Sequence, residues 1–171
     1  MIGFRLTSTS AIKQVDAWRK IDHPNVVSVQ DVFTTQDFQG DSSLIFVYDY
    51  FPLSKTLVEE HSPTPNRYGR TVTTMVPDTI LWSYIVQLSS AMSRIHAAGL
   101  AVRCMDPSKI ILTDKNRVRL AACSIFDVVK FGEQRSLKDL QQDDLRNLGM
   151  LILGLGVNNL SPSIVVKNAI E

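Results

Sequence analysis

The sequence predicts an α+β fold, because strand patterns and long helical patterns occupy different parts of the chain. The run from Leu44 to Tyr50 is rich in β-branched and aromatic residues, which is typical of a buried strand. Two short apolar runs, Ile110 to Leu112 and Val118 to Leu120, flank a polar turn and predict a hairpin. A long helix is predicted from Pro77-Asp78 to Gly99, with apolar residues at helical spacing.

The composition is that of one ordinary folded domain. The chain has 171 residues, of which 44% are apolar and 20% are charged, enough to bury a sizeable core. A formal net charge of +1 excludes an overall electrostatic footprint for nucleic acid or membrane. No apolar run reaches the roughly 18 residues of a membrane-spanning helix, and the N-terminus does not resemble a signal peptide. We therefore expect no membrane partner.

Cysteine usage predicts a reducing compartment. The two cysteines, Cys104 and Cys123, fit no metal-site spacing. We expect a cytoplasmic protein in which both thiols are small buried hydrophobic groups. A disulfide between them is the less favoured alternative.

The N-terminal part is predicted to form a strand, a helix and a second strand. Met1 to Leu6 has strand character, and Ser8 or Ser10 is suited to cap a helix from Ala11 to about Ile21. The next strand pattern runs from Val26 to Phe33. Three apolar side chains fall on one face of the predicted helix: Val15, Trp18 and Ile21.

The polar stretch from Glu59 to Asp78 has no apolar period and predicts an extended loop. Arg67, Tyr68 and Arg70 within it are candidates to contact RNA or a partner, although a solvated loop is the simpler interpretation. The long helix follows, and we interpret its apolar stripe as core. The stripe consists of Leu81, Ile85, Leu88, Met92 and Ile95. His96, in the last turn, is predicted to interact with the terminal carbonyls rather than with a ligand.

The C-terminal part continues with a hairpin turn and a buried helix. Asp114 to Arg117 forms the turn, and Asn116 is suited to a left-handed conformation. The apolar run from Leu148 onward indicates the buried helix. Ile164 to Ile170 has the pattern of a further helix.

The stretch from Ile95 to Ser124 resembles the catalytic core of a protein kinase. It contains a helix end, a glycine, a catalytic loop with Arg103 and Pro107 in their kinase places, and a hairpin. The reactive groups of that core are replaced. On the kinase pattern the loop His is Val102, the general-base Asp is Cys104, the Lys is Asp106, the metal-binding Asn is Lys109, and Asp-Phe-Gly is Ala122-Cys123-Ser124.

These replacements predict a pseudokinase. Phosphoryl transfer needs carboxylates that hold Mg²⁺ and orient the attacking hydroxyl, and neither Ala122 nor Cys104 supplies one. Lys109 places an ammonium near the metal position, where it can replace part of the charge beside a phosphate. An active kinase that uses substitute groups is the disfavoured alternative.

Other motifs extend the resemblance to kinases. His23-Pro24-Asn25 matches the motif after the regulatory helix, which puts the position of that helix's Glu at about Gln14, without its charge. Tyr48 falls at the gatekeeper position, and Phe51 to Thr56 falls at the interlobe hinge. The resemblance also implies that Asp144, in the buried central helix, accepts hydrogen bonds from the catalytic-loop backbone.

We expect a protein-kinase-like fold that is truncated at the N-terminal glycine-loop strands and at the C-terminal part of the large lobe. Residues 1–56 would form a partial small lobe and hinge, residues 57–78 the polar loop, and residues 79–171 a partial large lobe. The activation segment, Phe126 to Lys138, is short and lacks Ala-Pro-Glu.

Six stretches make the resemblance more specific. They are Phe46 to Tyr50, Leu53 to Leu57, Pro65 to Gly69, Leu81 to Tyr84, Met105 to Ile110 and Leu140 to Leu145. Together they resemble the family of pseudokinase subunits of the poly(A)-nuclease deadenylation complex, up to about Leu160. The resemblance implies a non-catalytic regulatory subunit that recruits a separate exonuclease subunit to mRNA and supports shortening of the poly(A) tail.

The same resemblance implies partners and a place in the cell. It implies a cytoplasmic protein, also found in P-bodies, that binds ATP without phosphotransfer and works with poly(A)-binding protein and mRNA through the complex. In the family, a coiled coil and a C-terminal knob form the homodimer and hold the nuclease. Neither element is among these residues, so we do not expect this chain alone to form the homodimer.

By this resemblance, nucleotide contacts map onto the hinge and the catalytic loop. The candidate ATP-binding residues are Asp49, Tyr50, Phe51, Pro52, Leu53, Ser54, Lys55, Thr56, Ser108 and Lys109. ATP binding is expected to be weak, because the glycine-rich wall is missing. The alternative is a protein or RNA interaction module that no longer binds nucleotide.

A cluster of positive charge is also expected near the loop and hairpin, where it would face the phosphate of a nucleotide or of RNA. It consists of Lys109, Lys115, Arg117 and Arg119. A solvated hairpin face is the simpler alternative.

Overall fold

The computed structural model describes residues 9–38, 42–62, 64–65, 71–72, 75–157 and 160. Several predictions lie outside these residues: the strand over residues 1–6, the cap at Ser8, the contacts of residues 67, 68 and 70, and the helix over residues 164–170. The described part combines helices with small antiparallel sheets, which confirms the α+β prediction.

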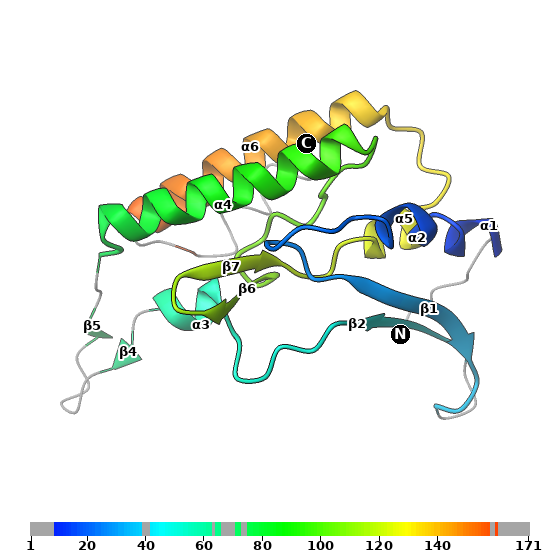
Figure 1. Cartoon of the computed structure of the whole chain (residues 1–171), viewed down its shortest axis with the longest axis horizontal. Coiled ribbons are helices and arrows are strands. Elements are labelled where there is room, and N and C mark those ends of the chain that lie inside the picture. The colour runs from blue at the N-terminus through cyan, green and yellow to red at the C-terminus, as the bar shows by residue number, and fades with distance from the viewer. Residues whose placement is uncertain are drawn as a thin grey trace.

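Two long helices run side by side along one side of the molecule (Figure 1). Helix α4, Asp78–Ala97, ends at Gly99, whose φ of +75° is the left-handed conformation that glycine adopts at helix ends. Helix α6, Leu137–Gly156, starts after Ser136, whose hydroxyl accepts a hydrogen bond from the Asp139 amide. Both predicted helices are confirmed, and the second begins before the apolar run that indicated it.

The strands form separate sheets. β1, Val29–Thr35, pairs antiparallel with β2, Ser43–Tyr48. In the other main sheet the order is β3-β6-β7, formed by Lys55–Thr56, Ile110–Asp114 and Arg117–Leu120. The predicted hairpin is confirmed, and Asn116 in its turn has a φ of +61°.

The strand predicted over residues 26–33 starts later, at Val29. Val26 instead forms an isolated parallel bridge with Leu120. The amide of Val27 donates to the Leu120 carbonyl at 2.9 Å, and the Leu120 amide donates to the Asn25 carbonyl at 2.8 Å. The backbone therefore pairs with the edge of β7 before it turns into β1.

The prediction of one continuous helix over residues 11–21 is wrong. The structure has two single turns, α1, Thr9–Ile12, and α2, Val15–Trp18. The Gln14 and Asp16 amides bond to carbonyls three residues earlier, so the backbone tightens between them. The predicted apolar face is nevertheless confirmed, because Val15, Trp18 and Ile21 are all buried.

The loop predicted over residues 59–78 is also corrected. It begins inside helix α3, Leu57–His61, and contains the strand pair β4, Thr64–Pro65, and β5, Thr71–Val72. Thr56 and Glu59 form a capping box: the Thr56 hydroxyl accepts from the Glu59 amide, and the Glu59 carboxylate accepts from the Thr56 amide. This cap, together with fully buried Leu57, fixes a helix where polarity alone suggested a loop.

Replacing Thr56 with alanine is expected to lower the free energy of unfolding by about 1 kcal/mol, because the Glu59 amide at the start of α3 loses the hydroxyl that caps it. Urea unfolding followed by circular dichroism measures the change. Thr56→Ser keeps the hydroxyl and serves as the control. Equal losses in the two variants would show that the cap contributes nothing.

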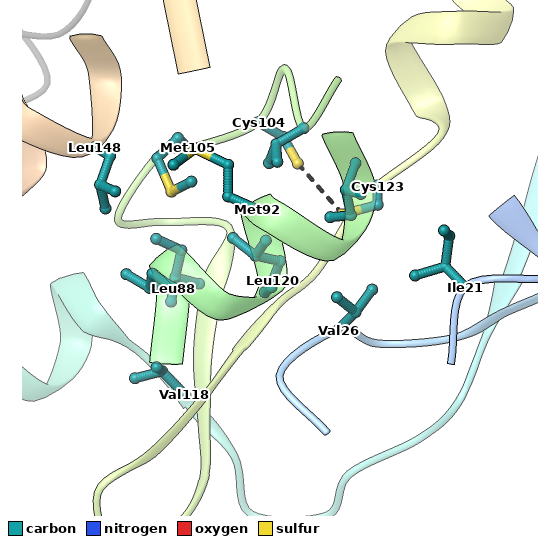
Figure 2. Close-up of a cluster of buried hydrophobic side chains, with 14 of the residues drawn as sticks. Ile21, Val26, Leu88, Met92, Cys104, Met105, Val118, Leu120, Cys123 and Leu148 are labelled. Atoms are coloured by element: carbon teal, nitrogen blue, oxygen red, sulfur yellow. Dashed lines mark hydrogen bonds between the residues drawn. The ribbon is translucent and has the colours of Figure 1, made fainter. Parts of the chain in front are cut away.

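One hydrophobic core joins the elements (Figure 2). Helix α4 contributes Leu88 and Met92, β7 contributes Val118 and Leu120, and α6 contributes Leu148. Among the described residues, no helix combines the length and apolar character needed to cross a bilayer.

Acidification is expected to destabilise the fold, because two histidines are held neutral. Burial lowers the pKa of His61, whose Nε2 lies 3.2 Å from the Tyr84 hydroxyl, and burial followed by the charge of Arg94 lowers the pKa of His23. Below the ordinary value of 6.5, the unfolded chain binds more protons than the folded chain. The free energy of unfolding therefore falls as pH drops below 6.5 toward the lowered folded values.

Urea unfolding between about pH 7.5 and pH 5.5 tests this, since most carboxylates titrate below that window. His61→Gln keeps a hydrogen-bonding side chain and should remove part of the pH dependence. An unchanged slope in His61→Gln would exclude His61 as a contributor.

Candidate functional site

The loop after α4 occupies the place of the catalytic loop in the kinase pattern and has an unusual backbone. Arg103 has a φ of +57°, a strained conformation for a residue with a side chain. The carboxylate of Asp144, on α6, is completely buried and accepts hydrogen bonds from the amides of Val102 and Arg103, both at 2.7 Å. These two bonds hold the loop in its left-handed turn. The role predicted for Asp144 is therefore confirmed.

His96 also contacts Asp144, which corrects its predicted role. Its Nε2 lies 2.8 Å from Oδ2 of Asp144. The carbonyls at the end of α4 are met instead by Gln141, whose amide nitrogen donates to the carbonyls of Leu100 at 2.9 Å and of His96 at 3.4 Å. A side chain on α6 therefore reaches those carbonyls and leaves the imidazole to support the loop.

The Arg103 side chain ties the loop to the segment that follows the hairpin. Its guanidinium bonds to Asp127 at 3.0 Å and to Glu133 at 2.9 Å, and it is only 12% exposed. Asp127 lies in α5, Ile125–Val129, and also accepts a bond of 2.6 Å from the indole nitrogen of Trp18. One carboxylate thus joins the loop, α5 and α2. Arg103 could be identified from its place in the kinase pattern, whereas its partners Asp127 and Glu133 were not predicted.

The two thiols, Cys104 at the general-base position and Cys123 at the Phe position of Asp-Phe-Gly, are buried and close together. The Sγ atoms of Cys104 and Cys123 lie 3.8 Å apart, and both thiols are free (Figure 2). Cys104 also donates to the Ala121 carbonyl at 3.4 Å. The hydrogen bond with Cys104, and then burial, raise the pKa of the Cys123 thiol, so it stays protonated. A protonated thiol neither holds a metal ion nor acts as a base. The prediction of buried, unpaired cysteines is confirmed.

The segment in the place of Asp-Phe-Gly keeps an unusual backbone. Ala122 and Ser124 have φ values of +59° and +76°. The hydroxyl of Tyr48, the gatekeeper residue of the kinase pattern, donates to the Cys123 carbonyl at 2.6 Å and lies 3.4 Å from the Ser124 hydroxyl. Burial raises the pKa of Tyr48 to about 12. The tyrosine therefore remains a neutral donor that holds this segment against β2.

The predicted hinge residues occupy the connection between β2 and α3. Asp49 accepts a bond of 2.7 Å from the Gln30 side chain, and the guanidinium of Arg119 lies 4.3 Å from the centre of the Phe51 ring. Tyr50 and Leu53 are 85% and 98% exposed. Pro52 is exposed, Ser54 donates its amide to the Phe51 carbonyl at 3.4 Å, and Lys55 and Thr56 form β3.

The predicted loop residues lie at the start of β6. Ser108 donates both its amide and its hydroxyl to Asp106, at 2.7 Å and 2.6 Å. The Lys109 carbonyl accepts from the Ala121 amide at 2.8 Å, and its side chain is exposed. Pairing of Thr56 with Ile111 brings the end of the hinge alongside the strand that Lys109 precedes.

Much of the candidate site is already engaged within the protein. The side chains of Asp49, Thr56 and Ser108 bond to Gln30, Glu59 and Asp106 respectively. The predicted positive cluster is divided. Lys109 precedes β6 and Arg119 pairs with Ile111 near that end, whereas Lys115 and Arg117 lie at the hairpin tip. The Asp49 and Ser54 amides are also bonded, and residues 55–56 pair with β6. The groups that remain accessible to a ligand are therefore the hinge backbone over residues 50–53 and the Lys109 ammonium. Among the described residues, no group of three or more His, Cys, Asp or Glu side chains is placed to bind a metal ion.

The comparisons with known proteins agree with this geometry. No protein-family model matches the chain. The chain is 52% identical over 163 residues to the "PAN2-PAN3 deadenylation complex subunit PAN3" of Aspergillus terreus, a match that covers 95% of this chain and 24% of that protein. The chain therefore spans about a quarter of the length of that curated relative.

Solved structures show the same likeness. One is a complex of Neurospora crassa PAN2 (WD40-CS1) with PAN3 (pseudokinase and C-term), with a TM-score of 0.85, 45% identity, and coverage of 93% of this chain and 38% of that chain. Another is the Drosophila melanogaster PAN3 pseudokinase, with a TM-score of 0.82, 42% identity, and coverage of 94% and 42%. The chain therefore spans about two fifths of the length of each of these solved chains.

Proposed function

This chain belongs to the PAN3 pseudokinase family, and we propose from this that it is a non-catalytic scaffold segment of a deadenylation complex, where it supports recruitment of the exonuclease subunit to poly(A) tails. The observation that carries the proposal is that the catalytic loop keeps the carboxylate that supports its backbone but not its catalytic base. Asp144 holds the loop's backbone in shape, while the position of the catalytic base is a buried thiol, Cys104. The loop backbone is maintained, and the groups on which phosphotransfer depends in kinases are replaced.

The partners are proposed from the relatives. The Neurospora crassa structure contains PAN2 together with PAN3, and this chain matches part of that PAN3. We extend the same partner to this chain, with poly(A)-binding protein and mRNA joining through the whole complex in the cytoplasm and in P-bodies. The homodimer is proposed for the full-length subunit and not for these residues alone.

Binding to the nuclease subunit is the first test. The purified chain is mixed with a purified PAN2-type subunit, and the mixture is followed by size-exclusion chromatography and by the rate at which a poly(A) RNA is shortened. Co-elution, or a changed shortening rate, is expected. A cooperatively folded chain that neither co-elutes nor changes the rate would contradict the proposal. So would phosphate transfer from ATP that is lost in Cys104→Ala.

We also propose weak ATP binding through the backbone of the hinge, residues 49–56, and the ammonium of Lys109. The support is that Lys109 is exposed beside the segment in the place of Asp-Phe-Gly, with Ala121 bonded to its carbonyl. A ligand that binds only the folded state raises the unfolding midpoint. The expected rise is the same with Mg²⁺ and with EDTA, because Lys109 and Ala122 stand where the kinase pattern has its metal-binding Asn and Asp.

Thermal unfolding with and without millimolar ATP tests this proposal. Lys109→Ala should remove the rise, whereas Lys138→Ala, which removes an exposed lysine on α6, should keep it. No rise with a cooperative transition would favour the second candidate, an interaction module without nucleotide. That candidate is favoured by the engaged side chains of Asp49, Thr56 and Ser108.

A further inference from the structure

A cavity of about 340 Å³ lies between the β6–β7 turn, helix α4 and the turn that precedes β1. We propose that this hairpin-tip cavity binds a phosphate group, with Lys115 and Arg117 at its rim and Ser83 as a hydroxyl donor. The hairpin-tip cavity lies at the opposite end of the hairpin from Lys109, which precedes β6. Phosphate binding here therefore requires neither the proposed nucleotide site nor the nuclease partner.

The polar wall of the cavity is held in place by Gln87. Its amide nitrogen donates to the Asn116 carbonyl at 2.8 Å, and its amide oxygen accepts from the Val118 amide at 3.1 Å. Asn25, which is only 7% exposed, donates to Gln87 at 2.7 Å and to the Val118 carbonyl at 2.8 Å. These bonds fasten the hairpin turn to α4. The two basic residues therefore extend from a backbone that is fixed before any ligand binds.

The charge of the cavity is one-sided. Lys115 and Arg117 are exposed, and neither forms an ion pair with any residue in the part of the chain that the structure describes. None of the residues that line the cavity is acidic. Asp114 is the nearest carboxylate in sequence, and its oxygen accepts the backbone amide of Lys115 at 2.7 Å. An anion in the cavity would therefore meet two cations that form no ion pair with the residues that the structure describes.

Ser83 adds a directional donor. Its oxygen accepts a hydrogen bond of 2.9 Å from the Gln87 amide, which orients the hydroxyl. Within the described residues, its hydrogen is given to no other group, so it remains free to donate to a ligand that lies in the cavity. Two cations and a hydroxyl donor together match the oxygens of a phosphate, which accept charge-assisted hydrogen bonds.

Another cavity, of about 210 Å³, lies beside the catalytic loop and provides a useful contrast. Its basic residues, Arg103 and Lys130, are paired with Asp127 and Glu133, which line the same space. Its positive charge is therefore already neutralised. Of these two cavities, only the hairpin-tip cavity has basic residues without an ion pair among the described residues and no acidic residue in its lining.

Nuclear magnetic resonance titration of the full chain tests the proposal. Inorganic phosphate is added at constant ionic strength, with chloride as compensation, and the amide signals are followed. Saturable shifts are expected at Lys115, Asn116 and Arg117. The double variant Lys115→Ala/Arg117→Ala should weaken binding by at least about tenfold. Ser83→Ala, which keeps both charges, should weaken it less.

A matched control removes the same charge elsewhere. Lys20 and Lys138 are exposed and lie outside the cavity, so Lys20→Ala/Lys138→Ala should bind phosphate as the natural chain does. Unchanged melting midpoints establish that each variant is folded. A linear response without saturation, or equal weakening by the two double variants, would overturn the proposal.

A second arm identifies the source of the phosphate. A short single-stranded adenylate oligonucleotide presents phosphodiesters, whereas inorganic phosphate presents a free anion. Oligonucleotide binding that is lost in Lys115→Ala/Arg117→Ala assigns the hairpin-tip cavity to a nucleic-acid backbone. Saturable binding of inorganic phosphate alone assigns it to a free phosphate. Oligonucleotide binding that survives this double variant, without phosphate binding, rejects the site.

Discussion

Replacing Asp144 with alanine is expected to lower the free energy of unfolding by about 3–5 kcal/mol, the largest effect of any polar substitution that we predict. The carboxylate is completely buried, and its removal leaves the amides of Val102 and Arg103 without acceptors. Each buried, unbonded amide costs about 1–3 kcal/mol. His96 loses its contact as well.

Urea unfolding of Asp144→Ala and Asp144→Asn measures the effect. Asparagine keeps one oxygen but presents an NH₂ group to the second amide. Asp144→Asn should therefore lower the free energy of unfolding by less than Asp144→Ala does. The adjacent Asp143 provides a matched control, since it forms an exposed ion pair with Arg135 and its replacement should cost under about 1 kcal/mol. A loss at Asp144 no larger than at Asp143 would show that the loop does not depend on this carboxylate.

Replacing Trp18 with alanine is expected to cost about 3–5 kcal/mol, because the indole is 2% exposed and its loss leaves a large cavity. The indole nitrogen also donates to Asp127, which is the acceptor that connects α2 to Arg103. Trp18→Phe keeps most of the ring and loses the donor. The bond to a charged acceptor contributes about 1.5–3 kcal/mol to its loss. The smaller ring adds a packing contribution, and the total should stay below that of Trp18→Ala.

The chain contains its own control for this experiment. Trp82, on the outer face of α4, is 65% exposed, so Trp82→Ala should change the free energy of unfolding by under about 0.5 kcal/mol. Fluorescence of each single-tryptophan variant reports unfolding from a different site. If Trp18→Ala and Trp82→Ala cost the same, α2 is not packed against the core as described.

The sequence was informative where a local pattern decides the structure. The apolar period from Leu81 to Ile95 predicted α4, and a polar turn between two apolar runs predicted the β6–β7 hairpin. Thr56 and Glu59 also have the spacing of a capping box, so the start of α3 was predictable from the sequence. The helix was missed because the residues around it are polar and suggested a loop.

Other features depend on contacts that no local pattern encodes. Trp18 and Asp127 are 109 residues apart in the sequence, so their bond becomes visible only in the fold. The basic residues of the hairpin seemed to form one cluster because they are near in sequence. The two ends of an extended hairpin lie far apart. Lys109 therefore lies beside the catalytic-loop segment, whereas Arg117 lies at the tip of the β6–β7 hairpin.

The buried thiol pair has a practical consequence for measuring motion. Cys104 and Cys123 are the only cysteines of the chain, and both are almost fully covered by the core. An alkylating reagent can reach them only when the segments around the degenerate catalytic loop separate. The labelling rate under native conditions therefore reports the opening equilibrium of this one region. Because both thiols belong to the natural sequence, no engineered labelling site is needed to follow local unfolding of this region.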